Sequence, residues 1–264
     1  MAGCWEWIAE QSGLRVGVAT SRREHTTSTV VLAGEQALLI DPAWDPDELD
    51  WIAADLAGSG IAITAGFATH AHHDHVLWHP GLGDAPRWAC AEVVRAAAAE
   101  HAQLVAAMGS GWPVGLADLL GRLTPIGAHG LPWSAPNPPE IEPITHNAHA
   151  PGHTALWLPA ARVLIAGDML SDIELPLLEQ STPADYAAGL TALRPYVDRA
   201  LAVIPGHGSP AVGAAAAAGR WQADRRYLDT LGHDDDTAPD GRLAMPGMAP
   251  AHRENREQAA RSAT

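Results

Sequence analysis

Lysine is absent from this sequence, and cysteine occurs only twice, as Cys4 and Cys90. The 16 basic residues are therefore all arginines, and they stand against 31 acidic ones, for a formal net charge of −15. So acidic a chain has no broad basic face for a nucleic-acid backbone or an anionic membrane, and we expect neither partner. Two cysteines are also too few for a disulfide framework or a cysteine-based zinc site.

Long apolar runs are missing as well. No stretch approaches the roughly 18 apolar residues of a membrane span, and the N-terminal region lacks the basic start and apolar core of a signal peptide. We therefore expect a soluble cytoplasmic protein. Hydrophobic residues make up 47% of the 264 residues, which is enough for a sizeable core. Because neither a repeat nor a linker divides the chain, the expected organisation is a single domain over 1–264.

Strand and helix patterns alternate along the chain, which predicts an α/β fold. Apolar runs bounded by turn residues predict strands at 14–20, 28–33, 36–41, 61–69, 154–158, 162–167 and 200–204. Capping residues and helical spacing predict helices that begin at 46, 91, 183 and 209 and end near 56, 108, 197 and 231. The Gly- and Pro-rich segment 109–140 is typical of a lid or pocket wall. The polar tail 232–264 is expected to be irregular, with a short helix near 251–261.

The 14 histidines hold the sharpest functional signal. Four potential metal ligands fall within six residues, spaced H-x-H-x-D-H: His70, His72, Asp74 and His75. They follow the predicted strand 61–69, and α/β sheets present their functional loops beyond the carboxyl ends of strands. Imidazoles and a carboxylate placed so close need shared partners, which a bound cation supplies. This motif therefore predicts a metal site.

Three later motifs add ligands next to other predicted strands. They are Pro151-Gly152-His153-Thr154 (PGHT), Ala166-Gly167-Asp168 (AGD) and Pro205-Gly206-His207-Gly208 (PGHG). With the first motif they supply seven nitrogen or oxygen ligands and no thiolate. Such a donor set suits zinc, and also manganese or iron.

In this order, the four motifs resemble those of the metallo-β-lactamase superfamily. The resemblance implies an αββα sandwich, with mixed β-sheets and helices on both outer faces, and two Zn²⁺ ions per chain. It assigns His70, His72 and His153 to the first metal, Asp74, His75 and His207 to the second, and Asp168 to a bridge between them. Asp41, which ends the run Leu38-Leu39-Ile40-Asp41, matches an aspartate that supports the site from behind the ligands.

Several nearby residues have open roles. Among His146, His149 and His153, only His153 has the PGHT context, so it is the expected ligand; the roles of His146, His149, His73 and His129 stay open. The tryptophans close to the motifs either wall the site or pack in the core: Trp78, Trp88, Trp112 and Trp133.

The resemblance also implies a dinuclear metal-dependent hydrolase. Two neighbouring metal ions lower the pKa of a shared water, so a bridging hydroxide would attack a carbonyl held by one metal. The expected catalytic residues are Asp74, which orients the nucleophile, and Asp168. An aspartate bridge resembles the glyoxalase II and lactonase branches more than the zinc β-lactamases, so we expect a small, mostly uncharged ester, thioester, lactone or amide. The alternatives are a mononuclear iron oxidoreductase similar to persulfide dioxygenases, and a non-catalytic metal-binding protein. The natural substrate, native metal and oligomeric state stay open.

Overall fold

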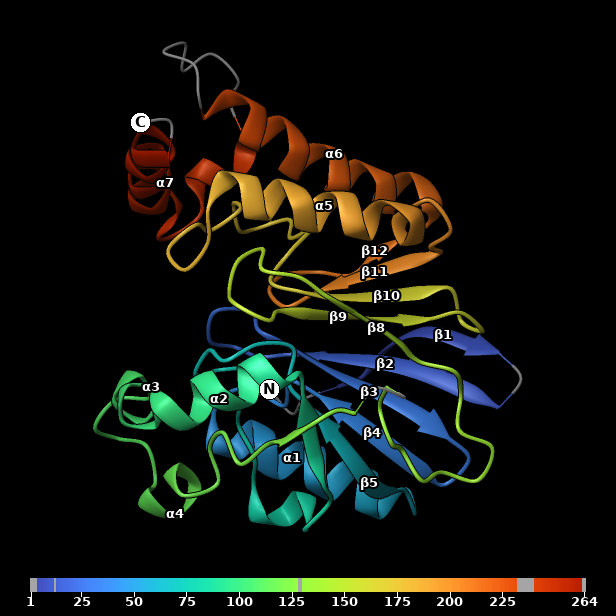
Figure 1. Cartoon of the computed structure of the whole chain (residues 1–264). Coiled ribbons are helices and arrows are strands. Elements are labelled where there is room, and N and C mark those ends of the chain that lie inside the picture. Colours follow the sequence, from blue (N-terminus) through green and yellow to red (C-terminus); the bar gives the residue numbers. More distant parts are fainter. Residues whose placement is uncertain (1–3, 12, 128–129, 232–239, 263–264) are drawn as a thin grey trace.

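The structure is a computed structural model that describes residues 4–11, 13–127, 130–231 and 240–262. Two β-sheets pack face to face, and helices cover both outer faces of the pair (Figure 1). This confirms the αββα sandwich expected from the sequence. None of the described helices has the length and apolar character to cross a membrane.

The first sheet has seven strands that lie in their chain order. They are β1 (Glu6–Gln11), β2 (Leu14–Thr20), β3 (Thr27–Ala33), β4 (Gln36–Ile40), β5 (Ala62–Phe67), β6 (Arg87–Ala89) and β7 (Thr124–Pro125). Strands β1 to β4 are antiparallel neighbours, and from β4 to β7 the pairing is parallel. The turn Gly34-Glu35 joins β3 to β4 because Ala33 pairs with Gln36. The sequence analysis missed β1, an edge strand whose residues are half-buried or exposed.

The second sheet has five strands, in the order β12 (Ala211–Val212), β11 (Ala202–Pro205), β10 (Val163–Gly167), β9 (Thr154–Leu158) and β8 (Glu142–Thr145). Only β10 and β11 pair in parallel. The core between the two sheets contains residues from both, such as Val16, Leu38, Leu156 and Ile165. These side chains are almost completely buried, which fixes how the sheets face one another.

Helices close the two outer faces. On the first sheet lie α1 (Pro46–Gly58) and α2 (Ala91–Ala99), and the chain continues into α3 (His101–Ala107) and α4 (Val114–Ala117). On the second lie α5 (Pro183–Val197) and α6 (Ala214–Thr230), with α7 (Met248–Ser262) beside them (Figure 1). Helix α1 starts as predicted: Pro46 is its first residue, and Glu48 accepts a hydrogen bond of 3.1 Å from the backbone of Asp45.

Two expectations about helices need correction. The predicted helix 91–108 is divided at Glu100 into α2 and α3. The tail is also more regular than expected: residues 241–244 form a 3₁₀ turn and α7 runs from Met248 to Ser262. Helix α7 has few apolar residues, and its buried Asn255 bonds to the backbone of another segment, so it shows no clear apolar periodicity. Residues 232–239 of the tail lie outside the described residues.

The segment 109–140 packs largely against the first sheet's outer layer. Leu120 is buried in the same cluster as Val93 of α2, and Leu116 is buried as well. His129 lies outside the described residues, so its role stays a question.

Candidate metal centre

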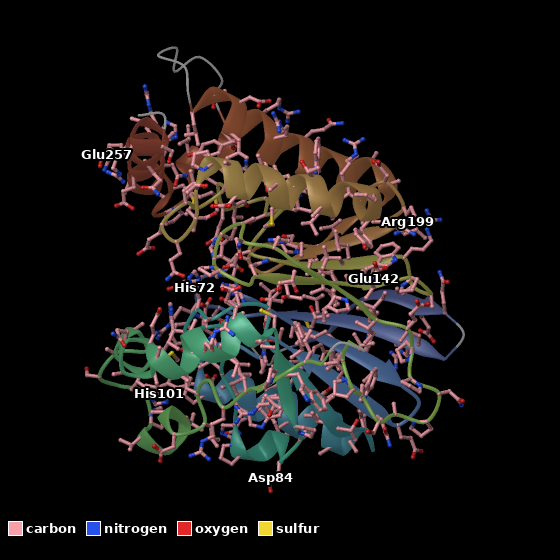
Figure 2. All side chains as sticks on the ribbon, viewed as in Figure 1. His72, Asp84, His101, Glu142, Arg199 and Glu257 are labelled. Carbon is pink, nitrogen blue, oxygen red and sulfur yellow. The ribbon has the colours of Figure 1, made fainter. Side chains whose placement is uncertain are left out.

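The predicted ligands gather at one edge of the sandwich, on loops that leave the strands there. Because β10 and β11 run in parallel, the residues that follow them, Asp168 and His207, lie at the same edge. The backbone of Thr27, at the start of β3, donates a 2.7 Å hydrogen bond to the carbonyl of Gly206, which ties the two sheets together at this edge. His72 marks the place in Figure 2, far from Glu142 and Arg199 at the other end.

The first group of ligand atoms comes from three histidines and Asp168. One nitrogen or oxygen of each lies within 4.8 Å of all the others, and the histidines are His70, His72 and His149. Oδ2 of Asp168 is 3.3 Å from Nε2 of His70 and 3.3 Å from Nε2 of His149. The same nitrogen of His149 is 3.1 Å from Nδ1 of His72.

The second group contains Asp74, His75 and His207, again within 4.8 Å of one another. The Nε2 atoms of His75 and His207 are 3.2 Å apart. Oδ2 of Asp74 lies 3.4 Å from Nε2 of His75 and 3.3 Å from Nε2 of His207.

Asp168 lies between the two groups. Its Oδ1 is 3.2 Å from Nε2 of His75, and its Oδ2 is 3.4 Å from Nε2 of His207. One carboxylate therefore reaches imidazoles of both groups, an arrangement suited to a group shared by two cations.

Residues behind the ligands fix their orientation. Asp41 accepts a 3.0 Å hydrogen bond from Nδ1 of His75, and its carboxylate is held by the backbone N–H and the hydroxyl of Thr69, at 2.8 and 2.6 Å. Nδ1 of His207 donates to the carbonyl of Glu24 at 2.8 Å. In both histidines the bonded Nδ1 leaves Nε2 directed at the site, as is usual for metal-ligating imidazoles.

The structure places His153 beside the first group: its ring centroid lies 5.1 Å from that of His70, and its Nδ1 is buried without a hydrogen bond among the described residues. Its Nε2 accepts a 3.1 Å hydrogen bond from the backbone N–H of Asp168, and its ring stacks on His146 with centroids 4.9 Å apart. His149 lies in the turn before β9 with a left-handed backbone (φ 66°), and its Nε2 lies 3.3 Å from Oδ2 of Asp168. The assignment of His153 to the first metal therefore stays a prediction, and His149 is a further candidate ligand.

The two carboxylates are ionised in spite of their burial. Burial raises the pKa of Asp168, but His75, His207 and His70 outweigh it and hold that pKa well below its usual value. Asp74 behaves in the same way, with His75 as the strongest opposing influence.

The imidazoles divide into two kinds. Burial lowers the pKa of His70, and it lowers that of His72 to about 3, so both rings are neutral and can donate a lone pair. Burial also opposes protonation of His207, but Asp168 and Glu174 outweigh it and raise its pKa to about 10. The carboxylates around the second group therefore stabilise a positive charge on His207.

The donor set fits a pair of divalent cations. Nε2 of His70 and Oδ1 of Asp168 are buried, and neither has a hydrogen bond among the described residues. Buried polar atoms rarely stay without a partner, and both atoms are directed at the cluster. Imidazole and carboxylate ligands without thiolate suit zinc, manganese or iron.

Sequence reasoning missed one acidic residue of the site, Glu174. Its carboxylate forms a third group of possible ligand atoms, with Asp168 and His207. Burial raises the pKa of Glu174 to about 7, against the opposing effect of His207. Glu174 lies six residues after Asp168 in the sequence and belongs to no motif, so no local signal identifies it.

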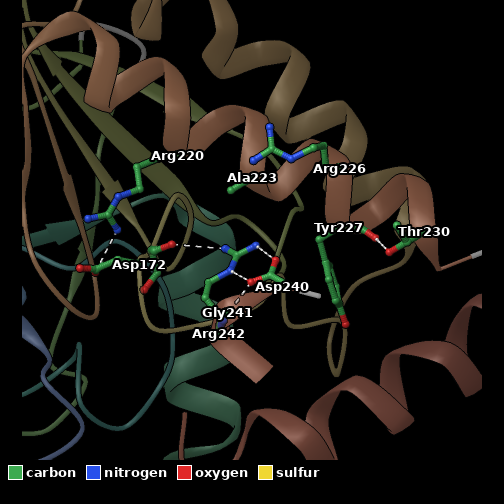
Figure 3. Close-up of a pocket in the computed structure, with 10 residues that line it drawn as sticks. Asp172, Arg220, Ala223, Arg226, Tyr227, Thr230, Asp240, Gly241 and Arg242 are labelled. Atoms are coloured by element: carbon green, nitrogen blue, oxygen red, sulfur yellow. Dashed lines mark hydrogen bonds and ion pairs between the residues drawn. The ribbon is translucent and has the colours of Figure 1, made fainter. Parts of the chain in front are cut away.

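The buried Arg242 connects the C-terminal segment to the loop that carries Glu174. Its guanidinium pairs with Asp224 at 2.5 Å and Asp240 at 2.8 Å, and Nη1 donates to the carbonyl of Glu174 at 2.9 Å. Figure 3 shows Arg242 beside Asp240, in the wall of a pocket of about 360 Å³ that Asp172 also lines. The C-terminal segment therefore supports the metal site's loop from behind.

Three of the four tryptophans near the motifs are core residues. Trp78, Trp88 and Trp133 are at most 9% exposed; Trp78 packs against the first sheet and α1, and the other two lie in the core between the sheets. The fourth, Trp112, packs edge-on against Trp44, with ring centroids 5.8 Å apart, and Trp44 in turn contacts the ring of His73 at 5.4 Å. The rings of Trp44 and Trp112 therefore lie beside the loop that carries His73.

Fold and site together define a metal-binding αββα protein. The sequence profile described as "Metallo-beta-lactamase superfamily" matches residues 22–207, well over half of the chain. This protein belongs to the metallo-β-lactamase superfamily. No curated protein matches it at a significant level.

Solved structures share the fold at low sequence identity. A metallo-β-lactamase from Erythrobacter litoralis is 18% identical, with a TM-score of 0.61 over 85% of this chain and 97% of that one. The metallo-β-lactamase DIM-1 is 13% identical, with a TM-score of 0.53 over 84% of this chain and 97% of that one. At such identities the likeness establishes the fold alone.

Proposed function

We propose that this protein is a dinuclear metal-dependent hydrolase that cleaves an ester, thioester, lactone or amide of a small molecule. The observation that carries the proposal is the position of Asp168, whose carboxylate lies within 3.4 Å of imidazole nitrogens from both ligand groups. Membership of a superfamily that includes metallo-hydrolases supports it.

In this proposal His70, His72 and His149 would hold one metal ion, and Asp74, His75 and His207 would hold the other. Asp168 is shared between them, and zinc is the metal that the ligands suit best. A pair of such ions, when bound, lowers the pKa of water and polarises a carbonyl oxygen.

The chain's own residues then position and move protons. Thr26 donates a 2.8 Å hydrogen bond to Oδ2 of Asp74 and so fixes that carboxylate. We assign its Oδ1 to accept the proton of the attacking water and pass it to the leaving group. Asp41 keeps His75 oriented through the 3.0 Å bond at Nδ1.

The substrate class follows from charge and surface. With a net charge of −15 and no lysine, the chain is ill suited to polyanionic substrates such as nucleic acids. The half-buried Trp112, which packs on the buried Trp44 next to His73, offers an apolar surface that suits a small organic acyl group.

The test is to measure bound metal and hydrolysis together in the wild type, in Asp168→Asn and in the control Asp229→Asn, which changes an exposed aspartate of α6. Elemental analysis of the wild type should find two zinc or manganese ions per chain. A panel of esters, thioesters, lactones and a β-lactam should show turnover that Asp168→Asn loses and the control keeps.

Two results would contradict the proposal. One iron per chain with oxygen uptake would indicate the oxidoreductase alternative. Two bound metals in Asp168→Asn with the full wild-type rate would show that Asp168 is not the shared ligand.

A further inference from the structure

The loop between β10 and α5, residues 168–182, contacts both halves of the metal centre although it contains neither helix nor strand. Near its start, the hydroxyl of Ser171 donates a 2.8 Å hydrogen bond to the carbonyl of His207. Near its end, the hydroxyl of Ser181 donates a 2.9 Å bond to the carbonyl of Asn147, in the turn that also carries a candidate ligand of the first group. The path of this β10–α5 loop therefore affects the ligands of both groups.

The side chain of Asn255, in helix α7, pairs with the backbone of this loop. Its Oδ1 accepts a 3.0 Å hydrogen bond from the N–H of Leu178, and its Nδ2 donates to the carbonyl of Pro176 at 2.6 Å. The same Nδ2 donates to the hydroxyl of Tyr227 on α6 at 2.9 Å. Because buried backbone groups need partners, this one amide does for the loop what a neighbouring strand does in a sheet.

Two further side chains of α7 bond to the same loop. The N–H of Leu175 donates to the sulfur of Met248 at 3.2 Å, and Nε2 of Gln258 donates to the carbonyl of Ser181 at 3.4 Å. Of the 15 residues of α7, only Met248 and Asn255 are buried. Apolar burial therefore contributes little to the docking of α7, which depends on its bonds to the β10–α5 loop.

We propose that Asn255 is a positioning residue for the metal centre, and that docking of α7 and binding of metal stabilise each other. The inference rests on the proposed two-metal site and adds to it an element that contains none of the ligands. Bound metal would order the ligand loops and with them the backbone groups that Asn255 contacts, and by linkage docked α7 raises metal affinity in return. The family match ends at residue 207, before α7, so it does not imply this coupling.

The first test needs no variant. Hydrogen exchange of the full-length wild type is followed by mass spectrometry in the metal-free and the zinc-loaded protein. Local opening sets the exchange rate of a weakly docked helix, so zinc should slow exchange in α7 by about tenfold. The edge strand β1, which does not contact the β10–α5 loop, is the internal reference and should exchange equally fast in both forms.

The second test compares Asn255→Ala with Glu254→Ala, which truncates the exposed neighbouring side chain. Zinc affinity, measured by competition with a chromophoric chelator, should be about tenfold weaker in Asn255→Ala and unchanged in the control. In Asn255→Ala, zinc should also no longer slow exchange in α7. Both variants are titrated where circular dichroism shows them folded, because a merely structural role for Asn255 would lower stability and leave the zinc affinity of the folded protein unchanged.

The remaining outcomes decide against the inference. Exchange in α7 that is equally fast with and without bound zinc would show that the helix and the site are not coupled. Equal zinc affinity in Asn255→Ala and Glu254→Ala would show that Asn255 does not position the ligands. If Asn255→Ala does not fold, the wild-type exchange experiment decides alone. A wild type that binds no zinc would overturn the two-metal site itself, whereas zinc binding without the change in exchange overturns only this inference.

Discussion

Replacing Arg242 with methionine should destabilise the protein by about 3–5 kcal/mol, the usual result of removing one partner from a buried ion pair. Arg242 is 5% exposed and Asp224 only 1%. In the variant, the carboxylate of Asp224 keeps its 2.9 Å hydrogen bond from the backbone of Leu170 but loses its cation. The carbonyl of Glu174 also loses a donor.

The assay is urea unfolding followed by tryptophan fluorescence, with all proteins at the same metal content. The control Arg225→Met removes an arginine of α6, the helix that carries Asp224; its pair with Asp229 is about half exposed, so the change should cost at most about 1 kcal/mol. In the double variant Asp224→Asn with Arg242→Met, the loss of stability should be smaller than the sum of the losses in the two single variants, because the charge of Asp224 is no longer left buried without its cation.

The same perturbation should also reach the metal site. Arg242 holds the loop that follows Asp168, so Arg242→Met should lower the rate of hydrolysis more than it lowers metal content. A loss of stability below about 1 kcal/mol, or additive effects in the double variant, would refute the view that this pair supports the loop.

Two other predictions concern the backbone and the pH response of the site. Gly206→Ala should weaken metal binding by about tenfold or more, because a Cβ there would collide with Oδ1 of Asp168. In the control Gly219→Ala on α6, the added Cβ contacts nothing, so this variant should bind metal normally. Equal metal affinity in both variants would contradict this prediction. Burial and His149 lower the pKa of His146 to about 4 from 6.5, so in the metal-free protein the unfolded state takes up a proton first as the pH falls. The free energy of unfolding should therefore drop by about 2 kcal/mol between roughly pH 6.5 and pH 4, after allowance for the partial exposure of His146. His146→Asn should lack this pH-dependent loss. An identical pH profile of stability in the variant would contradict the role of His146.

The fold could be read from the sequence where local patterns dominate. The strand predicted at 14–20 is β2, because its apolar side chains fill the core between the sheets. The sequence predicts a final helix from Ser209, but α6 begins at Ala214. Residues Ala211–Val212 pair with β11 instead, and Gly213, with φ 100°, turns the chain before α6 begins.

Part of the site could also be predicted from local sequence patterns. Ligands such as His70 and His207 belong to short motifs next to predicted strands, and the parallel pairing brings those strand ends together. The position of His149 beside Asp168 could not be predicted, because the PGHT motif does not specify the left-handed backbone of that residue. Glu174 is positioned by a hydrogen bond from Arg242, 68 residues away, so no window of the sequence contains its signal.

The central claim, that this edge of the sandwich holds two metal ions, is tested most directly by anomalous diffraction from crystals of the zinc-loaded protein. We predict two zinc ions with ligand distances of about 2.0–2.2 Å. One should be bound by His70, His72 and His149, the other by Asp74, His75 and His207, with Asp168 contacting both. Zinc bound elsewhere, a single ion, or coordination by His153 in place of His149 would contradict this arrangement.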